Sequence, residues 1–546
     1  MNQNIPRVIF GVLSLFILVA TLAPQMARGL SETFYVATDG NDSTGDGSVA
    51  KPWKTLAYAA DNVPPGNAIH VKAGDYLETR PVKLAVGVDL RGAGANRTVI
   101  RAGLDASYLI TLISPSNATG NQDISGFTID GNDKTLRGGV LVENVNNVSL
   151  HHVNFLRCRE SGSTFVDSSS RDWNKPPDKY VTGSKIYDCK YTNCASIPFK
   201  KADGSAAGMS GNLQLGGLDG AEVYNIEIED IASPGTEDGY GIKFAAGGYF
   251  KNLKIHDCKI KVNETAKAWI SNFCVELWNV GPGCEIYRVN ANTVFSLVNQ
   301  KSFDQKVANT QNLKVHDCRI INNRPGGSNN EAIEAYLSGL EIYGNYIENA
   351  SIGIAFWGTG HHISVRNNVF ANPKKMDNVW GQFPTMGLWL DAGNGTYSDL
   401  KIYNNVFDNY GDGVRFNTVN GDASPTGDFD GVDIKNNAFL RASNAIWETS
   451  GTQEAGRLRN VTLTYNLKDN AAVWVKNSNA VTPSKNLQGD PGYRGSGSRW
   501  DSYYRPSSKS SYCVDKGTNV GLPFSGAAAD IGCHEYALIT PKLRKP

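Results

Sequence analysis

Short apolar runs alternate with polar residues and turn formers along the chain, and one such pattern recurs between residues 148 and 468. Its clearest copies are Lys185-Ile186-Tyr187-Asp188-Cys189, Lys254-Ile255-His256-Asp257-Cys258 and Lys314-Val315-His316-Asp317-Cys318. The copies recur at steps of roughly 20 to 40 residues, a period typical of solenoids built from stacked units. Their central aliphatic residues, here called the anchors, are Leu150, Ile186, Val223, Ile255, Ile286, Val315, Ile342, Val365, Ile402, Ile434 and Leu463.

A second stack lies three residues after the anchors. Its members are Val153, Cys189, Ile226, Cys258, Val289 and Cys318, followed by Asn345, Asn368, Asn405, Asn437 and Asn466. Asparagine in consecutive copies predicts a ladder of side chains that tolerate left-handed backbone and hydrogen-bond the copies above and below. Val, Ile, Tyr and Phe, separated by Gly, Asn and Asp, favour strands over helices. The pattern therefore predicts an all-β solenoid, the parallel β-helix.

Both ends of the chain resemble those of a known superfamily. The segments Phe34–Asp42, Lys51–Leu56 and Val71–Tyr76 are similar to the N-terminal cap of secreted right-handed parallel β-helix proteins of the pectate-lyase-like superfamily. The segments Asp515–Gly521 and Ala529–Tyr536 resemble the tail that often ends such chains. The resemblance implies a right-handed helix and a carbohydrate-active protein. Because this superfamily contains lyases, glycoside hydrolases, epimerases and non-catalytic proteins, the activity must be argued from the site.

The chain divides into four segments. Residues 1–29 hold Arg7, an apolar run and small residues around Arg28, which predicts a signal peptide cut after Gly29 and a secreted protein, extracellular or periplasmic. Residues 30–105 are expected to form an N-terminal cap and the first coils, with a short helix over Trp53–Val63. Residues 106–470 are expected to form the parallel β-helix, and residues 471–546 a C-terminal capping segment.

Charge and cysteine content narrow the choice of partners. Basic and acidic residues number 53 each, so no overall field attracts nucleic acid or, after signal cleavage, a membrane. We expect an elongated monomer. Of the nine cysteines, those in the second stack are expected to be buried as small hydrophobes. If the protein is secreted, disulfides are allowed, and the pairs to consider are Cys513 with Cys533 and Cys274 with Cys284.

Several polar stretches predict loops. Ser161–Gly183, Asn299–Asn312 and Asn372–Met386 are expected to project from one face and wall a ligand groove. Asp39–Gly47 combines oxygen ligands with glycines, as a Ca²⁺ loop would, but a plain turn rich in Asx and Gly is the favoured interpretation. The sequence thus demands no cofactor, although it allows Ca²⁺.

A further strand precedes most anchors, and its central residue has apolar neighbours except where Glu448 follows Trp447. Since side chains alternate across a strand, the central residues are predicted to point outward. These central residues, here called the outward column, are Gln214, Lys243, Glu276, Ser296, Glu334, Ala355, Trp389, Arg415 and Trp447. Two positions further on, on the same face, come Trp278, Tyr336, Trp357, Asp391 and Asn417.

This face carries aromatic rings, carboxylates, cations and amides, a combination that suits a polysaccharide. Sugar rings stack on aromatic surfaces, and polar groups bond the hydroxyls. We therefore expect substrate-binding roles for Gln214, Trp278, Tyr336, Trp357, Trp389, Asp391, Arg415, Asn417 and Trp447. The alternative is that loops cover the aromatic residues and make them a satellite core.

Glu276 and Glu334 are the candidate catalytic pair, with Lys243 beside Glu276. With one coil between them, their backbones should lie roughly 9.6 Å apart, near the spacing of about 6.5 to 9.5 Å between carboxyl groups of inverting glycosidases. Apolar surfaces of Tyr336 and Trp357 are expected to raise the pKa of Glu334, which suits an acid. Lys243 would keep Glu276 ionised as a base. The sequence therefore favours a glycoside hydrolase.

Two other functions remain open. In a polysaccharide lyase, Lys243 would abstract a proton beside a uronate carboxylate, with Glu276 and Glu334 holding Ca²⁺. An ion pair with Glu276 would keep Lys243 protonated and weakens this interpretation. A non-catalytic glycan-binding module or adhesin would use the same aromatic groove without needing the carboxylates.

Overall fold

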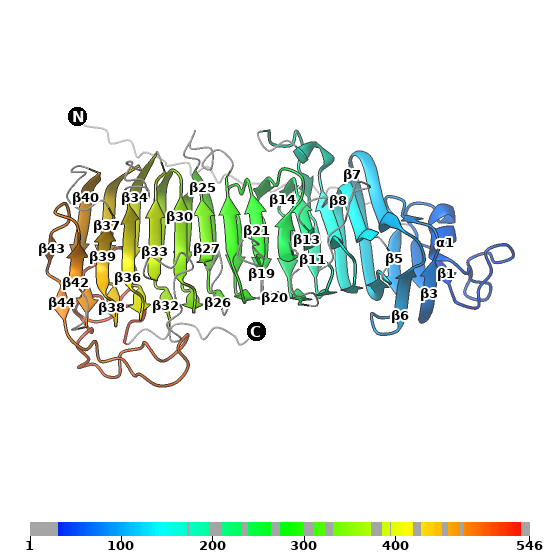
Figure 1. The fold of residues 1–546 in the computed structure, drawn as a ribbon. Helices are drawn as coiled ribbons and strands as arrows, with labels where there is room; N and C mark the ends of the chain where they lie inside the picture. The colour runs from blue at the N-terminus through cyan, green and yellow to red at the C-terminus, as the bar shows by residue number, and fades with distance from the viewer. Residues whose placement is uncertain are drawn as a thin grey trace, which may run out of the picture.

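The fold is an elongated stack of β-coils with the N-terminal coils at one end and the C-terminal coils at the other (Figure 1). The computed structural model describes residues 31–132, 134, 136–171, 175–195, 210–231, 239–263, 273–299, 310–322, 331–372, 385–393, 395–418, 427–449, 457–469 and 473–536. Strands of successive coils pair in parallel throughout the stack. The predicted right-handed parallel β-helix is thereby confirmed.

Three sheets run along the stack, and the long strands β7 (Ala106–Asp130) and β8 (Leu136–Leu156) pass through all three. The first, here called the anchor sheet, also contains β1 (Thr33–Val36), β2 (Ala68–Val71), β5 (Asp89–Gly92), β11 (Lys185–Tyr187), β15 (Glu222–Tyr224), β19 (Lys254–His256), β22 (Glu285–Tyr287), β25 (Thr310–His316), β28 (Ser338–Tyr343), β31 (Gly360–Arg366), β34 (Thr396–Tyr403), β37 (Asp428–Lys435), β40 (Leu458–Thr464) and β43 (Pro483–Ser484).

The next strand of each coil belongs to the second sheet. Besides β7 and β8 it contains β3 (Gly74–Glu78), β6 (Thr98–Ala102), β12 (Lys190–Thr192), β16 (Glu227–Asp230), β20 (Lys259–Val262), β23 (Asn290–Ala291), β26 (Arg319–Ile321), β29 (Tyr346–Glu348), β32 (Val369–Ala371), β35 (Val406–Asp408), β38 (Ala438–Leu440), β41 (Leu467–Lys468) and β44 (Leu487–Gln488).

The coil then enters the third sheet, here called the site sheet. Besides β7 and β8 it contains β4 (Val82–Lys83), β9 (Ser161–Val166), β13 (Ser210–Gly216), β17 (Gly239–Phe244), β21 (Val275–Trp278), β24 (Phe295–Val298), β27 (Glu331–Tyr336), β30 (Ile352–Trp357), β33 (Met386–Asp391), β36 (Asp412–Asn417), β39 (Asn444–Glu448) and β42 (Val473–Lys476). A small separate sheet joins β10 (Val181–Thr182), β14 (Leu218–Asp219) and β18 (Phe250–Lys251).

The register of the anchor sheet is the predicted one. Each anchor is paired with the next, from Leu150 with Ile186 to Ile434 with Leu463. All of them are buried in one continuous apolar core. The repeated pattern therefore marks equivalent positions in successive coils.

The asparagine ladder is also confirmed and is longer than expected. The Nδ2 atom of Asn345 donates to Oδ1 of Asn368 at 3.0 Å, and the same bond links each later member to the next. Asn486 extends the ladder by one more coil, since Asn466 donates to it at 3.2 Å. Because each amide also donates to a backbone carbonyl, the ladder satisfies polar groups inside an apolar core.

Left-handed backbone occurs one residue earlier than the sequence suggested. Asp188, Asn367 and Asn404 have φ of about 53°, whereas the ladder residues that follow Asn367 and Asn404 do not have positive φ. Asp and Asn tolerate this conformation because their short polar side chains bond the local backbone. The residue before the ladder thus turns the chain from the anchor sheet into the second sheet, which leaves the ladder side chain free to point inward.

The N-terminal cap contains the expected helix, which is shorter than predicted. Helix α1 spans Leu56–Asn62, because the Thr55 hydroxyl caps it by accepting a hydrogen bond from the backbone N–H of Tyr58. In the preceding Asp39–Gly47 turn, Asn41 and Asp42 accept hydrogen bonds from backbone N–H groups. No group of three or more metal-ligating side chains occurs among the described residues.

The C-terminal segment lies beside the last coils, below them in Figure 1. Tyr504, Cys513 and Ile531 pack on outward-facing residues of the second sheet, including Val406 and Ala438. The side chains of three left-handed asparagines donate to its backbone carbonyls, from Asn367 to Cys533, from Asn404 to Asp530 and from Asn436 to Thr518. The tail is therefore attached to three consecutive coils.

The cysteines and loops differ in part from expectation. Cys189, Cys258 and Cys318 are buried as predicted, and Cys274, Cys284, Cys513 and Cys533 are buried thiols that are not joined in disulfides in the structure. The stretch Ser161–Gly183 is not one loop, since it begins with the buried strand β9 of the site sheet. Much of the other two predicted loops, and all of the predicted signal peptide, lie outside the described residues. In the described part of the chain, none of the helices has the length and apolarity needed to cross a bilayer.

Candidate functional site

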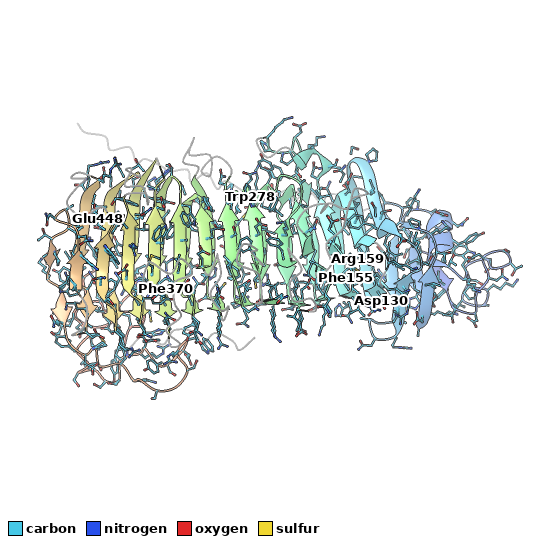
Figure 2. All side chains as sticks on the ribbon, in the orientation of Figure 1. Asp130, Phe155, Arg159, Trp278, Phe370 and Glu448 are labelled. Carbon is cyan, nitrogen blue, oxygen red and sulfur yellow. The ribbon has the colours of Figure 1, made fainter. Side chains whose placement is uncertain are left out.

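The outward column is continuous in the structure. Its register runs from Gln214 through Lys243, Glu276, Ser296 and Glu334 to the later coils. The same register then joins Glu334, Ala355, Trp389, Arg415 and Trp447 in that order. Each residue pair flanking the column points into the core, and Glu448, labelled in Figure 2, is buried as well. The predicted site residues therefore lie along a single face of the site sheet.

Lys243 and Glu276 form a buried ion pair on adjacent coils. The Lys243 Nζ atom contacts Glu276 Oε2, and both side chains are almost fully buried. Glu276 Oε1 accepts a 3.0 Å hydrogen bond from the indole N–H of Trp278. The ammonium also lies over the rings of Tyr240, at 3.7 Å from the centroid, and Phe244, at 4.8 Å. Glu276 is therefore bonded on one carboxylate oxygen by an ammonium and on the other by an indole N–H.

Glu334 has a different environment two coils from Glu276. Its Oε2 atom accepts a 2.7 Å hydrogen bond from Ser296 Oγ, and its Oε1 atom accepts one of 3.2 Å from the Tyr336 hydroxyl. Burial raises the pKa of Glu334, as does the nearby charge of Glu276, while the two hydrogen bonds lower it. The net direction is upward, as expected. Tyr336, however, acts as a donor that opposes the rise, because its hydroxyl points at the carboxylate.

Aromatic side chains connect the carboxylate pair to the later coils. The rings of Tyr336 and Trp357 are nearly parallel with centroids 6.3 Å apart, and Trp357 and Trp389 are 6.1 Å apart. Trp389 is not exposed, because it packs with Ala355, Ile352 and Met386 in a small cluster on this face. The satellite-core alternative thus holds for Trp389. Trp278, Tyr336 and Trp357 each keep a partly exposed surface.

A separate group of charged side chains lies at the C-terminal part of the face. Arg415 is buried and donates to Asp412 Oδ2 at 3.3 Å, while Asn444 donates to Asp412 Oδ1 at 2.8 Å. Burial raises the pKa of Asp412 to about 6 and lowers that of Arg415. Arg415 lies 3.9 Å from the centroid of the Trp447 ring, and Lys476, on the next coil, lies 4.0 Å from it. Cations from both neighbouring coils therefore lie against the Trp447 ring, which is only partly exposed.

Asp391 and Asn417 are brought together as neighbours. Asn417 Nδ2 donates to Asp391 Oδ2 at 2.7 Å, and the backbone N–H of Gly393 donates to Oδ1 at 2.8 Å. Burial raises the pKa of Asp391 against these hydrogen bonds. Gln214, at the other end, donates a long 3.5 Å hydrogen bond to the backbone carbonyl of Glu160. Each of these three side chains presents polar groups along the same face.

The sequence alone did not reveal the roles of three residues of this face. Ser296 was placed in the column but given no role, although its hydroxyl bonds Glu334. Tyr240 and Asp412 contact Lys243 and Arg415, respectively, from positions that the alternation did not mark as outward. For Asp412 the reason lies in the structure. A Cβ atom on Gly413 would lie 2.3 Å from the Phe439 ring, so Gly413 faces inward beside the inward-facing Val414, the alternation is broken there, and Asp412 faces outward.

The fold and this face define the class of protein as a right-handed parallel β-helix with a polar and aromatic strip along one sheet. Residues 38–168 match a family described as a protein of unknown function, DUF1565. No curated protein matches the sequence.

Three solved structures illustrate the structural similarity. Pectate lyase Pel9A is 13% identical with a TM-score of 0.31, and the alignment covers 93% of this chain and 98% of that one. A PL6 alginate lyase in complex with a trisaccharide is 12% identical with a TM-score of 0.36, covering 85% of each chain. The tailspike protein of E. coli bacteriophage HK620 in complex with a pentasaccharide is 10% identical with a TM-score of 0.45, covering 80% of this chain and 73% of that one.

Proposed function

We propose that this protein cleaves a polysaccharide bound along the site sheet, and that it does so as an inverting glycoside hydrolase. The observation that carries the proposal is the contrast between two carboxylates in one column. Glu276 is paired with a buried ammonium, whereas the pKa of Glu334 is raised. Two carboxyl groups placed in contrasting environments are what acid and base roles in glycoside hydrolysis require.

The proposed roles follow from these environments. Glu334 carries the proton and donates it to the glycosidic oxygen as the bond to the leaving sugar breaks. Glu276 accepts a proton from the water that attacks the anomeric carbon on the opposite side. Ser296, the small residue between the two coils, leaves space for that water. In this arrangement Lys243 is not a proton acceptor, and it acts as the counterion of Glu276.

The binding surface in this proposal is the remainder of the same face. Trp278, Tyr336 and Trp357 offer partly exposed rings to sugar faces, and Asp391 with Asn417 offers hydrogen-bonding groups to hydroxyls. Arg415 and Gln214 support the polar strip at its two ends. The comparison proteins are named for lyases or for saccharide complexes, but the saccharide ligand proposed here rests on the residues of this chain.

A panel of neutral and uronic polysaccharides tests the proposal. Incubation with the full chain should release reducing ends without ultraviolet absorbance, because hydrolysis creates no double bond. Glu276→Gln and Glu334→Gln should each lower turnover by about 100-fold or more, while Glu227→Gln, on the outer face of the second sheet, should retain full activity.

The alternatives give different results. Products that absorb in the ultraviolet would show β-elimination and would overturn the hydrolase proposal in favour of a lyase. If no glycan is cleaved, but one binds equally well to the wild type and to both Gln variants, the protein is a non-catalytic binder.

A further inference from the structure

Cys158 and Cys194 occupy the same position in two consecutive coils. Leu156 on β8 pairs with Thr192 on β12, and each cysteine follows its strand by two residues. The residues in between, Arg157 and Asn193, have left-handed φ values of 55° and 52°. The backbone therefore makes the same turn in both coils and carries the two thiols into the core one above the other.

Both thiols are completely buried. Burial and the neighbouring Cys158 thiol raise the pKa of Cys194. Each thiol donates to the carbonyl at the end of its own strand, from Cys158 to Leu156 at 3.7 Å and from Cys194 to Thr192 at 3.5 Å. Adjacent coils lie about 4.8 Å apart, which falls within the Cα separation of about 4.4 to 6.8 Å that a disulfide spans.

The cysteines of the second stack, three residues after the anchors, differ in this respect. Cys189 is equally buried and donates to the carbonyl of Tyr187 at 3.3 Å. The residues that stack on it in the flanking coils are Val153 and Ile226, which carry no sulfur. The repeat therefore places isolated thiols at several coils but brings two into register at Cys158 and Cys194.

We propose that Cys158 and Cys194 are a redox-active pair that forms a disulfide when the chain folds under oxidising conditions. A low-molecular-weight disulfide such as oxidised glutathione supplies the oxidising equivalents. One thiolate attacks it, releasing one glutathione thiol, and the other thiolate displaces the second glutathione thiol from the mixed disulfide. The two cysteine sulfurs are joined, and the two thiol protons pass to the two glutathione sulfurs, which leave as thiols.

The crosslink would act on the coil at the edge of the site face. The chain between the two cysteines includes strand β9 of the site sheet and Glu160, whose carbonyl accepts the hydrogen bond from Gln214. Closing this loop restricts the unfolded chain and ties the two coils together. Since both thiols are buried in the folded protein, the exchange takes place while this coil is still open during folding.

Peptide mapping tests the proposal. The full chain is produced in an oxidising compartment and, separately, in a reducing one, and free thiols are then alkylated in denaturant. The oxidised protein should lose two of its nine thiols and yield a Cys158–Cys194 linked peptide that reductant removes. Its Tm should exceed that of the reduced protein. If both Cys158 and Cys194 are alkylated in denaturant in protein that folded in the oxidising compartment, the proposal is overturned.

Variants separate this crosslink from general effects of oxidation. Cys194→Ser should abolish the linked peptide and the redox-dependent difference in Tm, whereas Cys189→Ser should preserve both. A redox-dependent Tm that persists in Cys194→Ser, together with a linked Cys513–Cys533 peptide, would assign the stabilisation to the tail and count against a role for Cys158.

Discussion

Ser296 Oγ donates a 2.7 Å hydrogen bond to Oε2 of Glu334 from the adjacent coil. A donor to the charged form of a carboxylate lowers its pKa, so the serine limits how far burial raises the pKa of Glu334. The side chain between the two carboxylates therefore regulates one of them.

Ser296→Ala should raise the pKa of Glu334 further. If Glu334 is the acid, it then stays protonated to higher pH, and the alkaline limb of the pH profile of kcat/KM moves upward. Steady-state rates across pH measure this shift. Ser364→Ala, on the anchor sheet, should leave the profile in place, and an unchanged profile in Ser296→Ala would contradict the assignment of Glu334.

Lys243→Met should destabilise the protein strongly. It leaves the buried Glu276 carboxylate without its counterion, a change that costs about 3 to 5 kcal/mol in comparable buried pairs. The double variant Lys243→Met/Glu276→Gln should regain part of this loss, because no unpaired charge remains. Denaturant unfolding of the three proteins at neutral pH measures the effect. Equal stability of Lys243→Met and the wild type would show that the pair contributes nothing.

Asp230 should make stability depend on pH in an unusual direction. Burial raises its pKa from 3.8 to about 6, so the folded protein retains a proton that the unfolded chain has lost. Stability from this group therefore falls as pH rises from about 4 to 6, by about 3 kcal/mol in total. Asp230→Asn can still accept from the backbone N–H of Ala195 and should remove this dependence. The check is the unfolding free energy of both proteins at pH 4 and at pH 6.5. Between these two pH values the wild type should lose stability relative to Asp230→Asn.

The middle of the asparagine ladder should tolerate substitution less than its end. Asn405→Val removes an amide that bonds Asn437, Val365 and the backbone of Asn368. Each buried group left without a partner costs about 1 to 3 kcal/mol. Asn486→Val, at the terminal coil, breaks fewer such bonds. Urea unfolding should show the larger loss for Asn405→Val, and equal losses would mean that the amides do not act as a ladder.

Two tryptophans of the aromatic strip, Trp357 and Trp447, should behave differently in binding. Trp357→Ala removes a partly exposed ring next to Tyr336 and should weaken glycan affinity by about tenfold or more. Trp447→Ala removes a ring already covered by Arg415 and Lys476 and should reduce stability more than affinity. Titration with the glycan identified in the panel, together with Tm values, separates the two effects. The reverse ranking would place the glycan over Trp447.

Much of this architecture was predictable because successive coils repeat the same pattern of buried aliphatic residues and turn residues. Aliphatic anchors at Ile186 and Ile255 recur with a left-handed Asp two residues later, so the register of one sheet could be fixed residue by residue. Strand alternation then extended this register to the outward column, including the pairing of Glu276 with Ser296 and Glu334.

What the sequence could not supply was the contact between neighbouring coils. Strand β9, Ser161–Val166, was missed because small polar side chains are typical of loops, although every residue in it is buried. The burial of Trp389 depends on Ile352 and Met386. Ile352 is far from Trp389 along the chain, and Met386 occupies a position that strand alternation assigns to the opposite face. The cations that cover Trp447 likewise come from separate coils. Exposure is a property of these contacts rather than of the local pattern.

The attachment of the C-terminal tail through Asn367, Asn404 and Asn436 limits how this protein could change in length. Most coils meet only their neighbours, so a whole coil inserted or deleted before Asn367 moves everything beyond it as a unit and leaves the tail in place. An insertion between Asn367 and Asn436 would instead separate two of the tail's attachment points by one coil spacing. Evolution could therefore duplicate coils in the N-terminal part without disturbing the tail, whereas duplication of a coil beneath the tail would disrupt its attachment.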